Sequence, residues 1–266
     1  MNTATDSSPA ARQARAARQQ AVVAALQAVL PAHAILYTPE DTTPYECDGL
    51  TAYRERPLVV ALPETDEQVQ AVLKTCHGLD VPVVARGAGT GLSGGAMPHA
   101  LGVTLSLAKF NRILKVDPVS RTAVVQGGVR NLAISEAAAP HGLYYAPDPS
   151  SQIACTIGGN VAENAGGVHC LKYGLTVHNV LKVKGFTIEG DAVEFGGDLL
   201  FDGIKLRAHV DHHLMTGLEL RGERCFAACN LCILFAQFRN EAGAAGVPQD
   251  VRFSAGFDGR LDLITA

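Results

Sequence analysis

Charge of either sign is scarce in this sequence. Charged residues make up only 18% of its 266 positions, and 22 basic against 26 acidic side chains leave a net charge of −4. The chain therefore has no excess of positive charge with which to bind a polyphosphate backbone, and no nucleic-acid partner is expected. Hydrophobic residues account for 47% of the chain, a composition typical of globular proteins and not of disordered ones.

Long hydrophobic runs are also missing. A helix that crosses a membrane needs about 20 consecutive apolar residues, whereas the run at 225–238 is short and interrupted by Asn230 and Gln237. We therefore expect no membrane-spanning segment. Arginines before the apolar run at 21–30 resemble a secretory or transit signal, but glutamines interrupt that run. A disordered tail over 1–19 followed by a surface helix is the prediction, with a targeting signal as the alternative.

The cysteines do not form the framework of a secreted, disulfide-stabilised protein, since they are odd in number and scattered. They are Cys47, Cys76, Cys155, Cys170, Cys225, Cys229 and Cys232. Free thiols and a cytoplasmic location are expected. The last three have the spacing of the iron–sulfur triplet of radical S-adenosylmethionine enzymes but lie close to the end of the chain. A zinc site with His212 or His213 is chemically permissible; free thiols are the default, and no metal site is predicted.

The patterns of apolar residues predict an α+β fold. Thr65 and Gln68 form a capping box for a helix that ends near His77, and Asn131 is the expected cap of a helix that ends near Ala139. Turn sequences join two pairs of alternating runs into hairpins, 113–117 with 122–126 and 180–188 with 192–195. Further strands are predicted at 58–62, 82–86 and 103–107.

Glycine is concentrated in one part of the chain, with 18 of the 27 glycines between Gly87 and Gly197. The first block, 86–95, contains the letters of the dinucleotide fingerprint. That fingerprint requires a helix directly after it, whereas strand-like sequence follows Gly94, which argues against a nicotinamide-dependent Rossmann dehydrogenase. Consecutive amides without a Cβ form an anion-binding nest in any case. A flexible surface loop is the alternative for this block alone.

A second block, 147–167, again combines glycines with small hydroxyl and amide side chains. Ile153, Ile157 and Val161 recur within it at near-helical spacing, which a linker would not need. Both blocks follow strand-like sequence. Two such blocks fit one long ligand held at two places, and a dinucleotide is the natural candidate.

Five motifs, in order along the chain, resemble the FAD-binding domain of the vanillyl-alcohol oxidase or PCMH-type flavoenzymes. They are RGAGTGLSGG at 86–95, APDPSS at 146–151, TIGGN at 156–160, NAGG at 164–167 and KYG at 172–174. Within this family the chain is most similar to the glycolate oxidase FAD-linked subunit and to the D-lactate and D-2-hydroxyglutarate dehydrogenases. The resemblance covers about residues 20–197.

The resemblance implies a PCMH-type domain of two α/β subdomains with FAD between them. The backbone of 87–91 would hold the pyrophosphate, and a second set of residues would line the other side of the cofactor. The implied cofactor-binding residues are Gly87, Ala88, Gly89, Thr90, Gly91, Ser93, Gly94, Ser151, Thr156, Gly158, Gly159 and Asn164. Family members that attach FAD covalently through this loop have a histidine where Thr90 stands, so non-covalent binding is expected.

The resemblance fades after Gly197, and residues 198–266 are predicted to be an atypical tail, truncated or frame-shifted, without the family's C-terminal cap domain. Because the family's catalytic and metal-binding groups belong to that cap, no catalytic residue is assigned here. His99, His141, His169 and His178 are expected to be structural or exposed. Partners implied by resemblance are a second FAD-domain subunit and an iron–sulfur subunit.

The implied reaction is oxidation of a small 2-hydroxy acid, of the glycolate or D-lactate type, with hydride transfer to flavin N5. The alternative, from another class, is a non-catalytic FAD-binding or assembly module of a larger oxidoreductase complex.

Overall fold

The computed structural model describes residues 8–196, 253–254, 258–262 and 264–265. Most of the predicted atypical tail, and with it the question of the cap domain, lies outside the described residues. The histidines and cysteines noted in that tail are also outside them: His209, His212, His213, Cys225, Cys229 and Cys232.

The first subdomain contains a four-stranded sheet of short, mostly buried strands. These are β1 (Ile35–Leu36), β2 (Val59–Ala61), β3 (Val83–Arg86) and β4 (Val103–Ser106). The strand order is β1-β2-β4-β3, with β2, β4 and β3 parallel and β1 antiparallel to β2. The three strands predicted from the sequence in this part of the chain are confirmed as β2, β3 and β4.

Helices α1 (Pro9–Leu26) and α3 (Asp66–Gly78) bury their apolar residues against this sheet. The Thr65 hydroxyl accepts a hydrogen bond from the Gln68 amide at 3.3 Å and caps α3 as predicted. Shorter elements complete the subdomain: α2 (Pro39–Thr42) and the 3-10 turns η1 (Ala32–Ala34) and η2 (Thr43–Tyr45). The shared core includes Val22, Leu26, Leu58, Val72, Leu73, Leu105 and Phe110.

Helix α1 begins at Pro9, well inside the stretch that the sequence analysis assigned to a disordered tail. That expectation is wrong from Pro9 onward. The reason is tertiary: Arg15 donates to the carbonyl oxygen of Arg56 at 3.1 Å, and Gln19 donates to that of Leu58 at 2.8 Å. Polar side chains on the exposed-looking part of the helix thus attach it to segments about 40 residues away, which no local pattern indicates.

The second subdomain contains a larger, antiparallel sheet. Its strands are β5 (Ile113–Asp117), β6 (Thr122–Gln126), β8 (Val180–Thr187), β9 (Ala192–Gly196), β10 (Phe253–Ser254) and β11 (Asp258–Asp262). Strands β5 and β6 pair with each other, as do β8 and β9, so both predicted hairpins are confirmed. The order along the sheet is β10-β8-β11-β6-β5, with β9 on β8.

Strand β11 lies between β6 and β8 and pairs with both in the antiparallel sense. Strand β12 (Ile264–Thr265) pairs with β7 (Leu143–Tyr144). The second subdomain therefore takes backbone strands from beyond Gly197, where the sequence analysis placed the end of the FAD-binding domain.

Short helices cover the second sheet and carry the second glycine block. They are α4 (Asn131–Ala138), α5 (Ile157–Glu163), α6 (Cys170–Tyr173) and the 3-10 turns η3 (Ala139–His141) and η4 (Thr176–Asn179). Asn131 is not the cap of α4, as had been expected, but its first residue, because its buried amide donates to the Pro147 carbonyl at 2.9 Å. A separate core forms here from Ala123, Val125, Val129, Ile134, Leu143, Tyr145, Ile157 and Val180.

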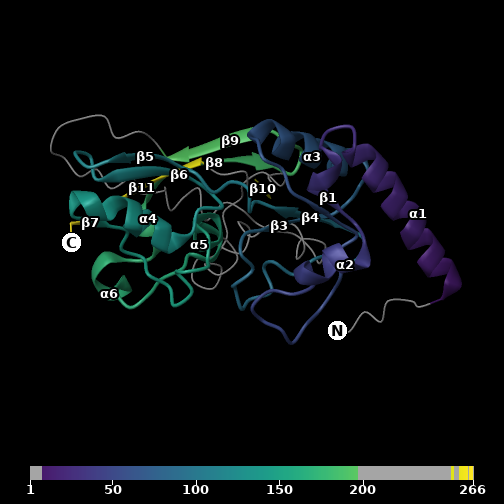
Figure 1. The fold of residues 1–266 in the computed structure, drawn as a ribbon, viewed down its shortest axis with the longest axis horizontal. Coiled ribbons are helices and arrows are strands. Elements are labelled where there is room, and N and C mark those ends of the chain that lie inside the picture. Colours follow the sequence, from purple (N-terminus) through teal and green to yellow (C-terminus); the bar gives the residue numbers. More distant parts are fainter. Residues whose placement is uncertain (1–7, 197–252, 255–257, 263, 266) are drawn as a thin grey trace, which may run out of the picture.

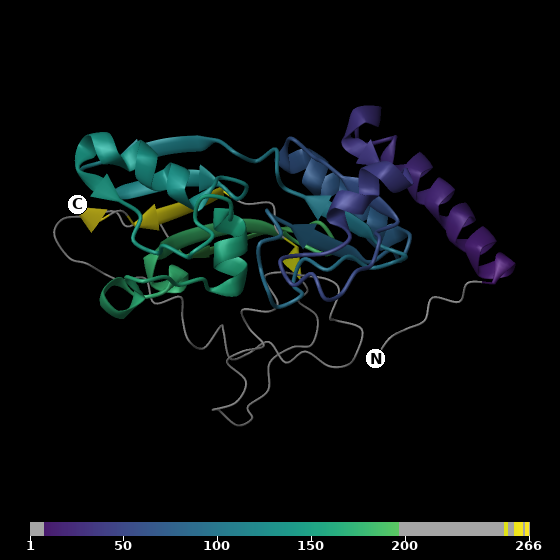
Figure 2. The same ribbon diagram turned by 60° about the horizontal axis from the view of Figure 1, so that its bottom comes forward.

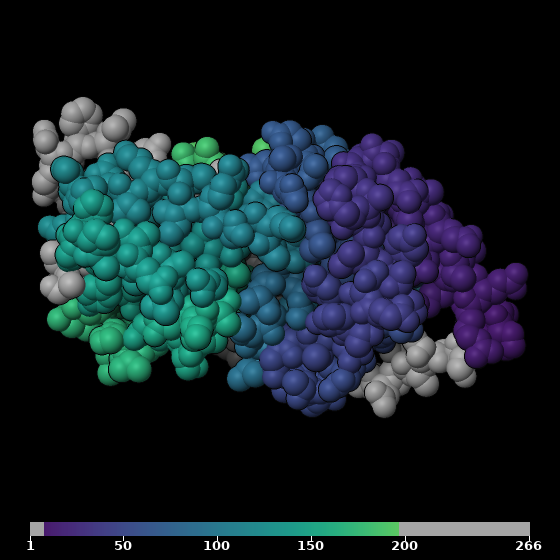
Figure 3. All heavy atoms as spheres, viewed as in Figure 1, coloured from purple at the N-terminus to yellow at the C-terminus, as the bar shows by residue number. Residues whose placement is uncertain are grey.

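Figure 1 shows the two subdomains side by side along the long axis of the molecule, with α1 at the outer end of the first. The turned view keeps the same separation (Figure 2). The space-filling view is indented where the blue first subdomain meets the teal and green second subdomain (Figure 3). The α+β class and the division into two subdomains are confirmed. Among the described residues, no helix is both long and apolar enough to cross a membrane.

Leu73 lies on α3 and is completely buried in the core of the first subdomain. We therefore predict a large effect on stability when its side chain is shortened. We expect Leu73→Ala to lower the free energy of unfolding by about 2–5 kcal/mol, because the lost methyl groups leave a cavity. Urea unfolding followed by circular dichroism measures it. Leu171→Ala is the matched control, since this leucine is 99% exposed, and we expect a change within about 0.5 kcal/mol. Equal effects of the two substitutions would contradict the assigned core.

Candidate functional site

The two glycine blocks meet at Gly87. A Cβ added there would collide with the Thr156 hydroxyl and would lie 3.6 Å from the Thr156 Cβ and 3.9 Å from the Gly159 amide nitrogen. Gly87 directly follows β3 of the first subdomain, and Thr156 directly precedes α5 of the second. The absence of a side chain at Gly87 therefore lets the two subdomains approach each other at this point. We call this contact the glycine seam.

The first block forms a loop that contains no helix. Gly89 and Gly94 have φ values of +70° and +77°, a region that favours glycine. Among the described residues, no helix separates Gly94 from β4, as the argument against a Rossmann fingerprint required.

The second block continues from the glycine seam into α5. The Gly158 amide donates to the Gly127 carbonyl at 2.8 Å, and a Cβ on Gly158 would lie 2.9 Å from that oxygen. The helix ends at Asn164, which has φ +48° and accepts a hydrogen bond from the Val177 amide through its side-chain oxygen at 3.0 Å. Gly158 is thus selected for close packing, and Asn164 for shaping the end of the helix.

Two buried polar atoms of this region have no protein partner in the described part of the chain. Within the described residues, the Thr156 hydroxyl oxygen at the glycine seam and Asp48 Oδ2 are buried and have no hydrogen-bond partner. Thr156 is 7% exposed and Asp48 is 4% exposed. Because a buried polar group without a partner is costly, the Thr156 hydroxyl fits a ligand that bonds to it at the glycine seam.

A third segment, residues 45–49, belongs to the site although the sequence analysis did not include it. A Cβ on Gly49 would lie 2.7 Å from the Thr90 carbonyl oxygen and 2.8 Å from that of Gly91, so only glycine fits against the first block here. Oδ1 of Asp48 accepts from the Leu50 amide at 2.8 Å. The only local signal for this segment is the Asp-Gly pair itself, which is common in ordinary turns.

Arg86 links the third segment to the first block. Arg86 is buried, with an exposed fraction of 8%, and its Nη1 donates to the carbonyl oxygens of Cys47 at 2.8 Å and Ala96 at 3.3 Å. Its Cζ also lies 5.6 Å from the centre of the Tyr45 ring. Burial lowers the pKa of Arg86, and the nearby Cys47, Tyr45 and Asp48 act in the opposite direction.

Glu163 joins the two blocks from the other side. Its Oε1 would lie 3.5 Å from a Cβ on Gly91, and the nearby Ser93 acts to lower the pKa of its carboxyl group. Burial raises the pKa of Glu163; Ser93 opposes that shift, and the Asp48 carboxylate adds to it. The sequence analysis missed this residue because nothing in the local pattern separates it from an exposed helical glutamate.

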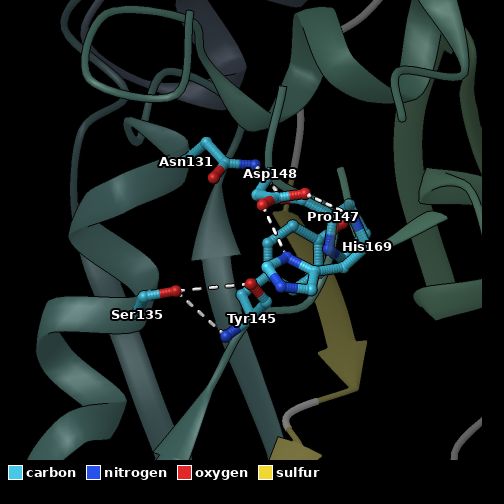
Figure 4. A network of polar contacts seen from close by, with 6 residues as sticks. All are labelled: Asn131, Ser135, Tyr145, Pro147, Asp148 and His169. Carbon is cyan, nitrogen blue, oxygen red and sulfur yellow. Dashed lines mark hydrogen bonds and ion pairs between the residues drawn. The ribbon is translucent and has the colours of Figure 1, made fainter. Parts of the chain in front are cut away.

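Figure 4 shows a network of polar contacts that fixes the start of the second block. Asn131 holds the Pro147 carbonyl, and the Ser135 hydroxyl accepts from the Tyr145 amide at 3.0 Å. Asp148 Oδ2 contacts His169 Nδ1 at 2.7 Å, and its Oδ1 accepts from the His169 amide at 3.2 Å. The 147–149 turn is therefore fastened both to α4 and to the loop that follows Asn164.

Other candidate histidines make local contacts. The Nδ1 atom of His99 accepts from the Leu101 amide at 3.1 Å, and Nδ1 of His178 accepts from the Leu175 amide at 3.0 Å. Burial lowers the pKa of His99. No three histidine, cysteine, aspartate or glutamate side chains lie close enough to hold a metal ion within the part of the chain that the structure describes.

Only some of the predicted site residues lie in contact with one another. Gly87, Thr156 and Gly159 meet directly at the glycine seam, and Glu163 of α5 lies beside Gly91. Ser151 accepts a hydrogen bond from the Cys155 amide through its carbonyl oxygen at 2.8 Å. Gly158 and Asn164 shape the ends of α5.

Comparison with known proteins assigns this arrangement to a family. A family model described as an FAD binding domain matches residues 57–196. The chain belongs to this family of FAD-binding domains. Its cofactor is FAD, and the glycine seam with its unpartnered Thr156 hydroxyl fits a dinucleotide.

Two curated relatives show which members of the family this chain is similar to. The chain is 65% identical over 179 residues to glycolate oxidase subunit GlcD of Escherichia coli strain K12, covering 67% of this chain and 36% of that protein. It is 37% identical over 198 residues to D-2-hydroxyglutarate dehydrogenase of Xanthomonas citri pv. viticola, covering 74% of this chain and 41% of that protein. The chain thus spans about 36–41% of the length of these relatives.

Solved structures agree on the fold of this FAD-binding domain. The structure of p-cresol methylhydroxylase with substrate bound has a TM-score of 0.67 at 17% sequence identity, covering 94% of this chain and 44% of that one. An alkyldihydroxyacetonephosphate synthase structure has a TM-score of 0.66 at 16% identity, covering 92% of this chain and 40% of that one. The resemblance to the PCMH-type family predicted from the motifs is confirmed.

The glycine seam makes a prediction about stability. Gly87→Ala places a methyl group against the Thr156 hydroxyl, and we expect it to lower the free energy of unfolding by about 1–3 kcal/mol because the side chain or the backbone must move. Chemical unfolding of the purified chain measures it.

Two further variants make this test specific. Gly78→Ala is the matched control, because a Cβ at Gly78 meets nothing within 4 Å. Combining Gly87→Ala with Thr156→Ala should recover most of the loss by removing the hydroxyl. A double variant as unstable as Gly87→Ala alone would show that the seam is not what excludes a side chain.

Proposed function

We propose that this chain is the FAD-binding part of a flavoenzyme that oxidises a 2-hydroxy acid of the glycolate or D-lactate type to the 2-oxo acid. The observation that carries the proposal is the glycine seam, where two segments come together around an unpartnered buried hydroxyl. Similarity to a glycolate oxidase subunit at 65% identity supports the substrate class.

We assign the cofactor contacts to the two glycine blocks. The backbone amides of 87–91 would hold the diphosphate of FAD, because glycines leave these N–H groups accessible to an anion. Ser93 and Gly94 would lie beside that contact, and the second block would supply the opposite wall. In this proposal the Thr156 hydroxyl donates a hydrogen bond to the cofactor, while Ser151, Gly158, Gly159 and Asn164 shape that wall.

Bound FAD would supply the electron acceptor for such a reaction, in which the Cα hydrogen of the substrate would leave as a hydride to N5 and a base would take the hydroxyl proton. The described residues of this chain would bind and orient the cofactor and keep water from its buried side. The base is expected from a part of the full-length enzyme beyond the described residues. The oxidation therefore depends on more than the FAD-binding domain.

A second candidate function is a module that binds FAD without turning over a substrate. No catalytic base is assigned among the described residues, and this alternative does not need one. Such a module would contribute its cofactor or a surface to a larger oxidoreductase complex. In either case the partners we propose are a second FAD-domain subunit and an iron–sulfur subunit.

Free thiols among the described cysteines fit a reducing, cytoplasmic location.

Purified 266-residue chain tests both functions. We expect it to bind about one FAD per chain and to become yellow, because FAD is the cofactor of its family. Absorbance near the flavin band is then followed after addition of glycolate or D-lactate. Bleaching of the colour supports the hydroxy-acid oxidase, and colour that no hydroxy acid changes supports the non-catalytic module. A chain that takes up no FAD contradicts both.

Non-covalent attachment is tested separately. Since Thr90 stands where covalently flavinylated family members have a histidine, we expect acid precipitation of the yellow chain to leave all the FAD in the supernatant. Fluorescence of the supernatant and of the redissolved pellet gives the two amounts. Flavin that stays with the precipitated chain would overturn this assignment.

A further inference from the structure

Arg86 is a buried cation that packs against the backbone of the first glycine block. A Cβ placed on Gly89 would lie 2.6 Å from the Arg86 Cζ and 3.1 Å from its Nε. The guanidinium thus fills the space where any side chain at Gly89 would go, directly against the backbone of the loop. Arg86 and Gly89 are only three positions apart, so the loop folds back over the arginine that precedes it.

The surroundings of Arg86 fix its orientation from two other segments. Nη1 is held by the carbonyl oxygens of Cys47 and Ala96, which lie before and after the loop in sequence. The Tyr45 ring lies 5.6 Å from Cζ. Nη1 alone donates both hydrogen bonds, while the planar guanidinium fork contacts an aromatic ring, and lysine has no planar group for that contact.

The charge of Arg86 is only partly compensated. Its nearest titratable neighbours are Tyr45, Cys47 and Asp48. Asp48 is the acid among them, and within the described residues it makes no ion pair with Arg86 shorter than 4.0 Å. A guanidinium stays protonated in proteins. A positive charge therefore lies against the loop whose amides would face the two phosphates of FAD.

We propose that Arg86 is a positioning residue for the diphosphate of FAD, which holds the 87–91 backbone in its binding conformation from beneath and adds a positive charge behind it. This inference rests on the proposed cofactor contacts and extends them to a residue that does not itself contact the reacting atoms. The part of the cofactor that Arg86 helps to bind is the doubly charged diphosphate.

Variants at position 86 separate shape from charge. Arg86→Met removes the charge and the hydrogen bonds, and we expect the Kd for FAD to rise about 10- to 100-fold, as a unit charge several ångströms away in a protein interior implies. Arg86→Lys keeps the charge and loses the fork, so its Kd should lie between those of the wild type and Arg86→Met. Quenching of FAD fluorescence on titration with the full chain gives each Kd.

Arg15→Met is the matched control. Arg15 also donates its side-chain hydrogen bonds to backbone carbonyls, those of Arg56, Pro57 and Ala100, but on α1 far from the glycine blocks. We expect it to lower the melting temperature and to leave the Kd for FAD within about twofold. If Arg15→Met weakens FAD binding as much as Arg86→Met does, general instability explains the loss and the proposal is overturned.

Asp48→Asn tests the charge directly, because it removes the neighbouring negative charge and keeps an oxygen for the Leu50 amide. We expect a lower Kd for FAD, opposite in sign to Arg86→Met, whereas a purely structural role would make both variants bind more weakly. Should Arg86→Met not fold, Arg86→Lys and Asp48→Asn still decide the question. Wild-type Kd values for both position-86 variants would overturn this inference alone, whereas a wild-type chain without FAD uptake would overturn the proposed function.

Discussion

The structure depends on the close contact between Gly87 and the Thr156 side chain. The end of a parallel strand in one subdomain and the start of α5 in the other lie so near each other there that a methyl group on Gly87 would collide with the Thr156 hydroxyl. Each subdomain has its own hydrophobic core, so either could bury its apolar residues without this contact. At the glycine seam, the missing side chain of Gly87 therefore allows polar groups of the two subdomains to lie close together.

Removing side chains has a consequence for electrostatics. A loop such as 87–91 exposes amide dipoles, but those dipoles need support because glycine constrains the backbone so little. Here the support comes from charged and polar side chains of three segments: Arg86 from β3, Asp48 from the 45–49 segment and Glu163 from α5. The Asp48 carboxylate acts to raise the pKa of both Arg86 and Glu163, so one acid lies close to the other two side chains. The 87–91 loop is thus rich in glycine, and its conformation is held by the surrounding side chains.

Much of the fold could be predicted from the sequence. The strands that became β2, β3 and β4, the Thr65 cap of α3 and both hairpins follow from apolar periodicity and turn chemistry, which act over fewer than about ten residues. Errors arose where a distant partner decided the outcome. Pro9 to Gln19 are helical because Arg15 and Gln19 reach carbonyls about 40 residues away, and Asn131 binds Pro147 rather than capping its own helix.

The candidate site divides in the same way. The sequence by itself determined that two glycine blocks exist and which family they resemble, because glycine and small hydroxyl residues leave backbone amides accessible whatever the fold. Only the tertiary structure decided which of these residues meet, and it added Asp48, Gly49 and Glu163 while placing Gly158 and Asn164 in structural roles. A contact between segments about 70 residues apart depends on how two cores pack against each other, and no local pattern along the chain encodes that distance.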